Sequence, residues 1–226
     1  MLQKLILCSV NVTAQQMTEL FLKLTKTGKL KHLDIEAIGD GGILKTIPST
    51  LFSEVIRNIH TVNLSYSKVR KCQLKHLLKD LQGDFKLKSL NLSSNTNLAL
   101  VPPKFISSIA NLHKLNVSGC DLSATQIRIL FRGVRDNKCM RELDISYNNL
   151  TQVSIETIAS VLSVLQRLNL SYSWLTQEGI NFVLKKLSER SAVTTFLDIR
   201  QKLPFRKIED IKEEARKLDI FYLLKI

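Results

Sequence analysis

The sequence is poor in the residues on which several classes of protein depend. Aromatic residues make up only 6% of its 226 residues, with one tryptophan, and there are four cysteines and four prolines. No run of eighteen apolar residues occurs, so we expect no transmembrane segment. The cysteines lie far apart, form no C-x-x-C pair and have no histidine cluster beside them. The sequence therefore predicts neither a zinc site nor a disulfide framework, but reduced thiols in an intracellular protein.

Signatures of catalysis and of cofactor binding are missing as well. The four histidines have no carboxylate and serine residues that the sequence could place beside them. Its glycines lack the lysine and the helix of a phosphate-binding loop. We therefore expect no catalytic residue, no metal and no cofactor, and we interpret the chain as a non-enzymatic protein.

Negative charge is scarce, since the net charge is +13 and the isoelectric point is near 9.7. Such an excess raises nucleic acid and anionic membranes as partners. The densest basic run consists of Lys68, Arg70, Lys71, Lys75 and Lys79, of which the last three share one helical face. No helix-turn-helix, zinc-finger or RNA-recognition motif accompanies it. We expect mainly a solvated convex surface and keep a basic scaffold for RNA or anionic membrane as an alternative.

What the sequence does contain is a repeated hexamer of the form L-x-x-L-x-L. Its copies begin at Leu2, Leu30, Ile59, Leu87, Leu112, Met140 and Leu165, and a degenerate eighth copy keeps Leu197 and Ile199. The alternating apolar positions predict a short strand with its apolar side chains on one face. A single repeat of this kind cannot bury its apolar face alone. The period of about 28 residues therefore predicts a solenoid whose repeats stack into one core.

Each predicted strand is followed by a turn and then by helical spacing of apolar residues. A small polar residue that could satisfy unpaired backbone groups stands three places after the last apolar strand position. In the middle of the chain these residues are Ser67, Asn95, Cys120, Asn148 and Ser173. Ser123 and Thr176 each precede such a helical pattern and are predicted N-caps. Strand, turn and helix in repetition predict the α/β fold class.

The best-formed copies, Leu87–Leu98 and Met140–Leu150, resemble the leucine-rich repeat motif L-x-x-L-x-L-x-x-N/C-x-L. The length of each repeat, together with its helix, resembles the ribonuclease-inhibitor-like class of this family. The resemblance covers about residues 2–200 and implies a horseshoe of about 8 repeats, with parallel strands on the concave face and helices on the convex face. It also implies protein binding, as in innate-immune sensors, ubiquitin-ligase adaptors, actin-assembly regulators and effectors that bacteria deliver.

The repeats predict one domain over residues 1–203, followed by a C-terminal capping segment over residues 204–226. In that segment Lys207–Lys217 is charged and helix-like, and Ile220–Ile226 is apolar and strand-like. Solenoids need an atypical last unit to cover the open end of the core. A segment that docks a partner is the alternative.

Candidate binding residues fall on the strands and just after them. Side chains between the apolar strand positions, such as Glu142 and Asp144, must project from the concave sheet. Tyr66, Tyr147 and Tyr172 occupy equivalent turn positions, and Trp174 follows the last of them. Tyrosine and tryptophan dominate binding hot spots, although a tyrosine packed only on its neighbouring turn remains the alternative. We predict that Tyr147, Tyr172, Trp174, Arg141 and Arg167 form one contact patch on the C-terminal concave rim.

These features together predict a basic, cytoplasmic protein–protein interaction module, which we expect to be a monomer. Nuclear location and delivery into a host cell stay open. The module could be the recognition part of a sensor, adaptor or effector. Besides the basic scaffold, a structural spacer within a larger protein remains an alternative. The full predicted partner-binding set is Trp174, Tyr172, Tyr147, Tyr66, Arg167, Arg141, Glu142 and Asp144.

Overall fold

Nine short strands form one parallel sheet in the computed structural model, which describes residues 2–8, 10–37, 43–189 and 192–226. The sheet order follows the chain from the first strand to the last, because each repeat adds its strand beside the previous one. The strands are β1 (Lys4–Ile6), β2 (His32–Asp34), β3 (Thr61–Asn63), β4 (Ser89–Asn91), β5 (Lys114–Asn116), β6 (Glu142–Asp144), β7 (Arg167–Asn169), β8 (Phe196–Asp198) and β9 (Leu224–Lys225).

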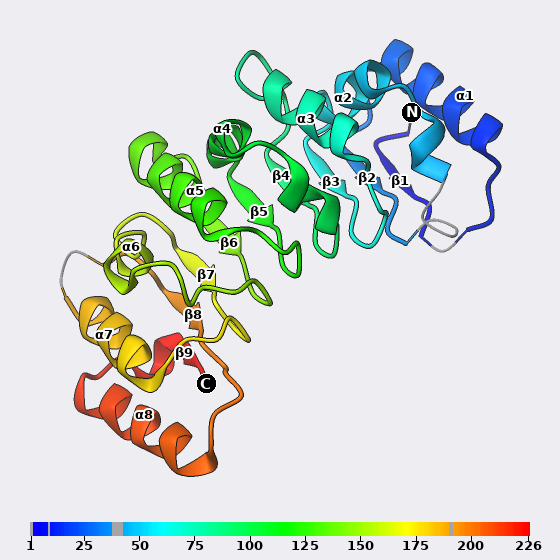
Figure 1. Cartoon of the computed structure of the whole chain (residues 1–226). Helices are drawn as coiled ribbons and strands as arrows, with labels where there is room; N and C mark the ends of the chain where they lie inside the picture. The colour runs from blue at the N-terminus through cyan, green and yellow to red at the C-terminus, as the bar shows by residue number, and fades with distance from the viewer. Residues whose placement is uncertain (1, 9, 38–42, 190–191) are drawn as a thin grey trace.

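Helices follow the strands and lie along the outer side of an arc, while the sheet lines its inner side (Figure 1). The α-helices are α1 (Ala14–Thr27), α2 (Ser49–Arg57), α3 (Lys71–Asp80), α4 (Pro103–Ile106), α5 (Ala124–Asn137), α6 (Ile155–Ala159), α7 (Gln177–Leu187) and α8 (Phe205–Lys217). Short 3-10 helices are η1 (Ile43–Thr46), η2 (Thr96–Leu100), η3 (Ser107–Asn111) and η4 (Phe221–Leu223). The predicted α/β solenoid, with strands concave and helices convex, is confirmed.

The longer helices begin where the sequence predicts. The Ser123 hydroxyl accepts a hydrogen bond from the Gln126 backbone N–H at 3.3 Å, and the Gln126 amide oxygen accepts one from the Ser123 N–H at 2.9 Å. This reciprocal pair satisfies two backbone donors at the start of α5. The Thr176 hydroxyl accepts from the Gly179 N–H at 3.1 Å and caps α7. Both predicted N-caps are confirmed.

The repeated leucines stack in register along the core. Leu90, Leu115, Leu143 and Leu168 occupy partner positions on consecutive strands, and none of them is more than 3% exposed. The first copy is less covered, since Leu2 is 59% exposed. Within the part of the chain that the structure describes, β1 has a neighbouring strand on one side only. The core is therefore continuous through the middle repeats and thins toward β1.

The small polar residues after the strands turn inward, as predicted. Asn148 donates from Nδ2 to the carbonyl oxygens of Val117 (2.9 Å) and Ile145 (3.0 Å), and its Oδ1 accepts from the Leu122 N–H (2.9 Å). It thereby joins two successive turns through groups that would otherwise stay unpaired. Cys120 donates its thiol to a buried carbonyl in the same way, and burial raises the pKa of this thiol to about 12.

The C-terminal segment adds a helix and a strand beside the last repeat. Helix α8 buries Ile211 and Ala215 in the core, and β9 pairs with β8 as the ninth strand. The buried Asp198 at the end of β8 forms ion pairs with Arg200 at 2.7 Å and Lys225 at 3.8 Å. Within the described ranges, none of the helices combines the length and the apolar character that crossing a lipid bilayer requires.

Candidate protein-binding surface

Three aromatic side chains stand at the carboxyl edge of the sheet, in the turns after β6 and β7. Tyr147, Tyr172 and Trp174 have positive φ angles of 55°, 54° and 62°, a conformation that bulky residues rarely adopt. The Tyr147 N–H donates to the Ser171 carbonyl at 3.1 Å, and the Tyr172 N–H to the Arg200 carbonyl at 2.7 Å. Neighbouring repeats therefore hold these turns in place while Tyr147 remains 53% and Trp174 59% exposed.

The two tyrosines stack on each other without becoming buried. Their ring centroids lie 4.8 Å apart with an interplanar angle of 21°, and the Arg200 guanidinium lies 5.9 Å from the Tyr172 centroid. Hydrogen bonds to Asp198 raise the pKa of this guanidinium, so the charge beside the rings is permanent. Tyr147 and Tyr172 thus pack on the adjacent turn and still remain exposed and half-buried, respectively.

An open, largely apolar hollow of about 470 Å³ lies beside these aromatic rings. The side chains of Tyr172, Trp174 and Leu203 supply its apolar wall, and Lys207 at the start of α8 adds a cation. Glu178 also borders it, and its own backbone N–H, the Thr176 hydroxyl and Lys207 lower the pKa of this carboxyl. The hollow therefore combines apolar surface with both signs of charge.

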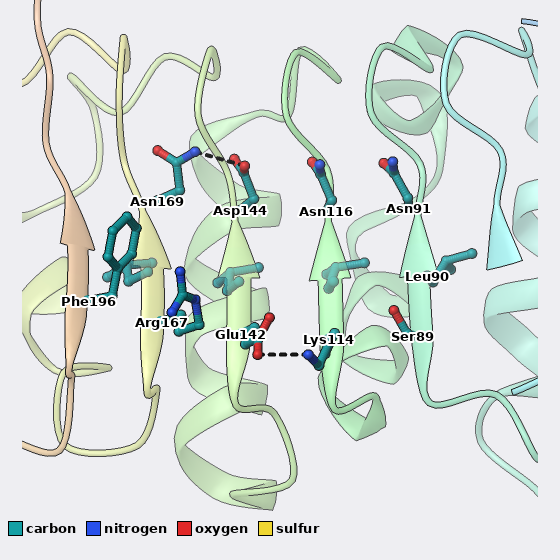
Figure 2. A pocket seen from close by; sticks show the side chains of 13 residues that line it. Ser89, Leu90, Asn91, Lys114, Asn116, Glu142, Asp144, Arg167, Asn169 and Phe196 are labelled. Carbon is teal, nitrogen blue, oxygen red and sulfur yellow. Dashed lines mark hydrogen bonds and ion pairs between the residues drawn. The ribbon is translucent and has the colours of Figure 1, made fainter. Parts of the chain in front are cut away.

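The concave face carries a second, more polar hollow of about 340 Å³ over β4 to β8 (Figure 2). Across β5 and β6, Lys114 forms an ion pair with Glu142 at 2.8 Å. Across β7 and β8, the Arg167 guanidinium lies over the Phe196 ring, 4.4 Å from its centroid. Figure 2 shows these side chains in one row along the sheet.

The second concave row, which includes Asp144, has a structural role in ending the strands. Asp144 accepts hydrogen bonds from the Ser146 N–H at 3.0 Å and from the Asn169 side chain at 2.8 Å. Asn91 and Asn116 accept the equivalent bond from the backbone two residues further on. Such side chains replace the ladder bonds that the strand loses as it turns. The row supports the turns and lines the floor of the concave hollow.

The predicted contact patch is not one patch in the structure. Arg141 precedes β6, and its guanidinium donates to the carbonyl oxygens of Lys138 and Met140. Tyr147 follows the same strand, and about 3.3 Å of rise per residue puts the strand between them. Only Tyr147, Tyr172 and Trp174 line a common hollow, while Arg167 lines the concave one. The strands separate residues that the sequence numbering brings close together.

The third candidate tyrosine lies farther along the same edge. Tyr66 follows β3 and is 60% exposed. It borders a third hollow of about 380 Å³ together with Tyr147, with Ser94 and Gly119 between them. Gly119 has a φ of 60°, and a side chain added there would meet Ser94 and Tyr147. The equivalent turn positions thus place two small residues, Ser94 and Gly119, between Tyr66 and Tyr147 along the edge.

Sequence reasoning missed the contribution of the residues that follow β8 to this surface. Gln201 donates to the Leu170 carbonyl at 2.8 Å and accepts from the Ser173 N–H at 3.0 Å, as asparagine does in earlier repeats. It stands one residue before the position where the pattern predicts a polar side chain. Lys202 and Leu203 line the aromatic hollow, although no repeat period places them there.

The basic run extends from the turn after β3 onto the convex helix α3, and one of its side chains, Arg70, is engaged within the fold. Lys71, Lys75 and Lys79 are exposed along α3, as their spacing predicts. The ammonium group of Lys75 lies 5.8 Å from the centroid of the Phe105 ring. Arg70, in contrast, donates to the Ile47 carbonyl at 3.1 Å and supports the turn before α3. Lys68 is exposed in the turn after β3.

One group of possible metal ligands lies near the first strands. Ligand atoms of Cys8, Asp34 and Glu36 lie within 4.8 Å of one another. The Cys8 thiol donates to Asp34 Oδ1 at 3.1 Å, and Asn63 donates to Glu36 at 3.3 Å. Burial, followed by the bond to Asp34, raises the pKa of the Cys8 thiol, which opposes the thiolate that a metal ion requires. These hydrogen bonds account for the group as part of the fold.

Comparison with known proteins places this geometry in a family. A model of the leucine-rich repeat matches residues 136–159, which include β6 and the turn that carries Tyr147. The solved structure of the leucine-rich repeat-containing protein LegL7 from Legionella pneumophila superposes with a TM-score of 0.62 at 15% identity. It covers 94% of this chain and 71% of that chain. The chain is a leucine-rich repeat protein.

Two curated relatives share the leucine-rich repeat. NACHT, LRR and PYD domains-containing protein 14 from Homo sapiens is 28% identical over 191 residues, which is 77% of this chain and 17% of the relative. NACHT, LRR and PYD domains-containing protein 4C from Mus musculus is 30% identical over 182 residues, 75% of this chain and 18% of the relative. The chain thus spans less than a fifth of these relatives. Leucine-rich repeat proteins are generally protein-interaction modules.

Proposed function

We propose that this leucine-rich repeat protein is a non-enzymatic module that binds another protein through the carboxyl edge of its sheet and the adjoining concave face. The observation that supports this is the cluster of exposed Tyr147 and Trp174 with half-buried Tyr172 beside an apolar hollow. The chain has few aromatic residues, yet three of them gather here at the surface. Large exposed aromatic side chains are the commonest source of binding energy at protein interfaces.

The geometry of the cluster favours binding because its side chains have little conformational freedom left to lose when a complex forms. The stacked rings of Tyr147 and Tyr172 already restrict each other, and the inter-repeat hydrogen bonds hold their turns. Each immobilised side chain otherwise costs about 0.5–1.5 kcal/mol when a complex forms. A partner side chain that enters the hollow beside Trp174 would bury apolar surface without that full cost.

The broader role that we propose is the recognition part of a sensor, acting as a monomer in the cytoplasm. The curated relatives support it, because their names combine leucine-rich repeats with NACHT and PYD domains. In this arrangement the repeats would select the partner and other domains would respond. The concave hollow lies over β4 to β8 and the aromatic hollow lies beside the turns that follow β6, β7 and β8, so one partner could contact both.

Alanine substitution at the aromatic edge tests this function. Proteins captured from a lysate would be identified by mass spectrometry, and the purified partner would then be titrated by calorimetry. We expect Trp174→Ala and Tyr172→Ala each to weaken the complex by about 2 kcal/mol or more, with little change in the melting temperature. Tyr222→Ala is the matched control, because Tyr222 is 77% exposed outside the hollow.

Two results would contradict the proposed function. If both alanine variants bind the partner as tightly as the wild type, the aromatic edge is not the binding surface. Equal losses in Tyr222→Ala and Trp174→Ala would also argue against it, because the effect would not depend on the hollow.

A further inference from the structure

Three charged side chains, Lys114, Glu142 and Arg167, stand next to one another on the concave face, and two of them form an ion pair with each other. The strand register places Glu142 beside both Lys114 and Arg167. Glu142 forms its ion pair with Lys114 at 2.8 Å, whereas Arg167 turns to the Phe196 ring. Among the residues that the structure describes, none forms a hydrogen bond or an ion pair with the Arg167 guanidinium. Figure 2 shows this division of the row.

The Arg167 guanidinium is oriented before any ligand arrives. The contact with the Phe196 ring, with 4.4 Å between the guanidinium carbon and the ring centroid, favours the orientations in which the guanidinium lies over the ring. Arg167 is exposed and Phe196 is half-buried, so the N–H donors at the edge of the plane face the open hollow. A planar fork of donors of this kind matches the two oxygens of a carboxylate.

The surroundings favour a carboxylate over a phosphate group. Glu142 and Asp144 line the same hollow as Arg167, and a doubly charged phosphate would be repelled by both of them more strongly than a singly charged carboxylate. Lys114 is the other cation that lines this hollow, and its charge is already paired with that of Glu142. An acidic side chain therefore finds its one complementary position over β7 and β8.

We propose that Arg167 and Phe196 form the site that receives an aspartate or glutamate side chain of the bound protein. This inference rests on the proposed function and names the chemistry that the partner presents to the concave face. The ion pair of Lys114 with Glu142 sets the register, because an acid shifted along the row would meet Glu142 instead.

Nuclear magnetic resonance of the arginine side chains tests the proposal without the natural partner. The Nε–H resonance of Arg167, assigned by its loss in Arg167→Lys, would be followed during titration with acetyl-tetraglutamate amide and with acetyl-tetraglutamine amide. We expect a saturable shift with the glutamate peptide alone. Arg167→Lys, monitored through backbone amides of β7, and Phe196→Leu should each weaken binding of the glutamate peptide about tenfold. Hydrogen bonds to charged groups contribute more binding free energy than those between neutral groups. Arg135→Ala on α5 removes the same charge from the convex side and should leave the affinity unchanged.

Three results would overturn the acidic site. They are an equal shift with the glutamine peptide, an unchanged affinity in Arg167→Lys, and a stronger response to tetrauridylate, which would indicate phosphate recognition. These experiments distinguish failure of the acidic site from failure of the proposed function. Loss of partner binding in Trp174→Ala without any glutamate response refutes only the acidic site. A glutamate response with an intact complex in Trp174→Ala refutes only the aromatic edge.

Discussion

At the scale of residues, buried polar side chains join each turn of the solenoid to the next. Asn148 makes hydrogen bonds to Val117, Ile145 and Leu122, and Asn95 makes the equivalent set in an earlier repeat. Each bond crosses between repeats or closes a turn where the ladder ends. Removing such a side chain leaves several buried backbone groups unpaired, which costs more than the bond itself.

Substitution of Asn148 should therefore destabilise the protein strongly. We expect Asn148→Ala to lower the free energy of unfolding by about 3 kcal/mol or more, measured by urea denaturation. Asn148→Cys should cost less, because Cys120 fills the equivalent position with a bond to the Leu92 carbonyl. Asn149→Ala is the control: its exposed side chain accepts hydrogen bonds only from the neighbouring Thr151, so its loss should change stability by about 1 kcal/mol at most. Equal losses at both asparagines would contradict this role.

Much of this residue-scale picture could be predicted from the sequence. Spacing from the strand identified Ser67, Cys120 and Asn148 as inward-facing, because every repeat sets the same geometry. The same rule missed Gln201, whose longer side chain reaches the Leu170 carbonyl from one position earlier. It also gave no sign that Glu142 would pair with Lys114 and leave Arg167 to Phe196, since that choice depends on side-chain rotamers.

At the scale of elements, the repeat predicts the order and register of the strands and helices better than it predicts which side chains meet on one surface. Strand register, helix N-caps and the stacked leucines all follow from the regular period of the hexamer. The placement of Arg141 and Tyr147 on one patch was wrong because β6 separates them. A helix over Lys207–Lys217 was predicted and α8 spans Phe205–Lys217, but its exact contacts with the core could not be predicted, since residues 204–226 do not repeat. We propose that this segment is the cap that covers the last repeat of the core.

The capping role predicts where α8 is sensitive. Ile211 is 1% exposed at the contact of α8 with the core, whereas Phe205 at the start of the same helix is 76% exposed. We expect Ile211→Ala to lower the free energy of unfolding by about 2–4 kcal/mol, as for other buried aliphatic side chains. Phe205→Ala should change it by about 0.5 kcal/mol or less. If urea denaturation gave equal midpoints for both variants, α8 would not be part of the cooperative core.

At the scale of the whole molecule, two faces compete for the role of binding surface. The convex face presents Lys71, Lys75 and Lys79 on α3 within a chain of net charge +13. The other surface presents the aromatic edge and the concave row that ends in Arg167 and Phe196. Diffuse positive charge gives salt-sensitive and unselective association, whereas ordered aromatic side chains beside a hollow can select one partner.

Hydroxyl-radical footprinting of the complex with the captured partner decides between these faces. Side chains that a partner covers are oxidised more slowly, and both faces carry reactive aromatic residues. The account predicts that Tyr147, Tyr172, Trp174 and Phe196 become protected while Phe105, beside Lys75 on the convex side, keeps its rate. Protection of Phe105 together with unchanged oxidation at Tyr172 and Trp174 would contradict it.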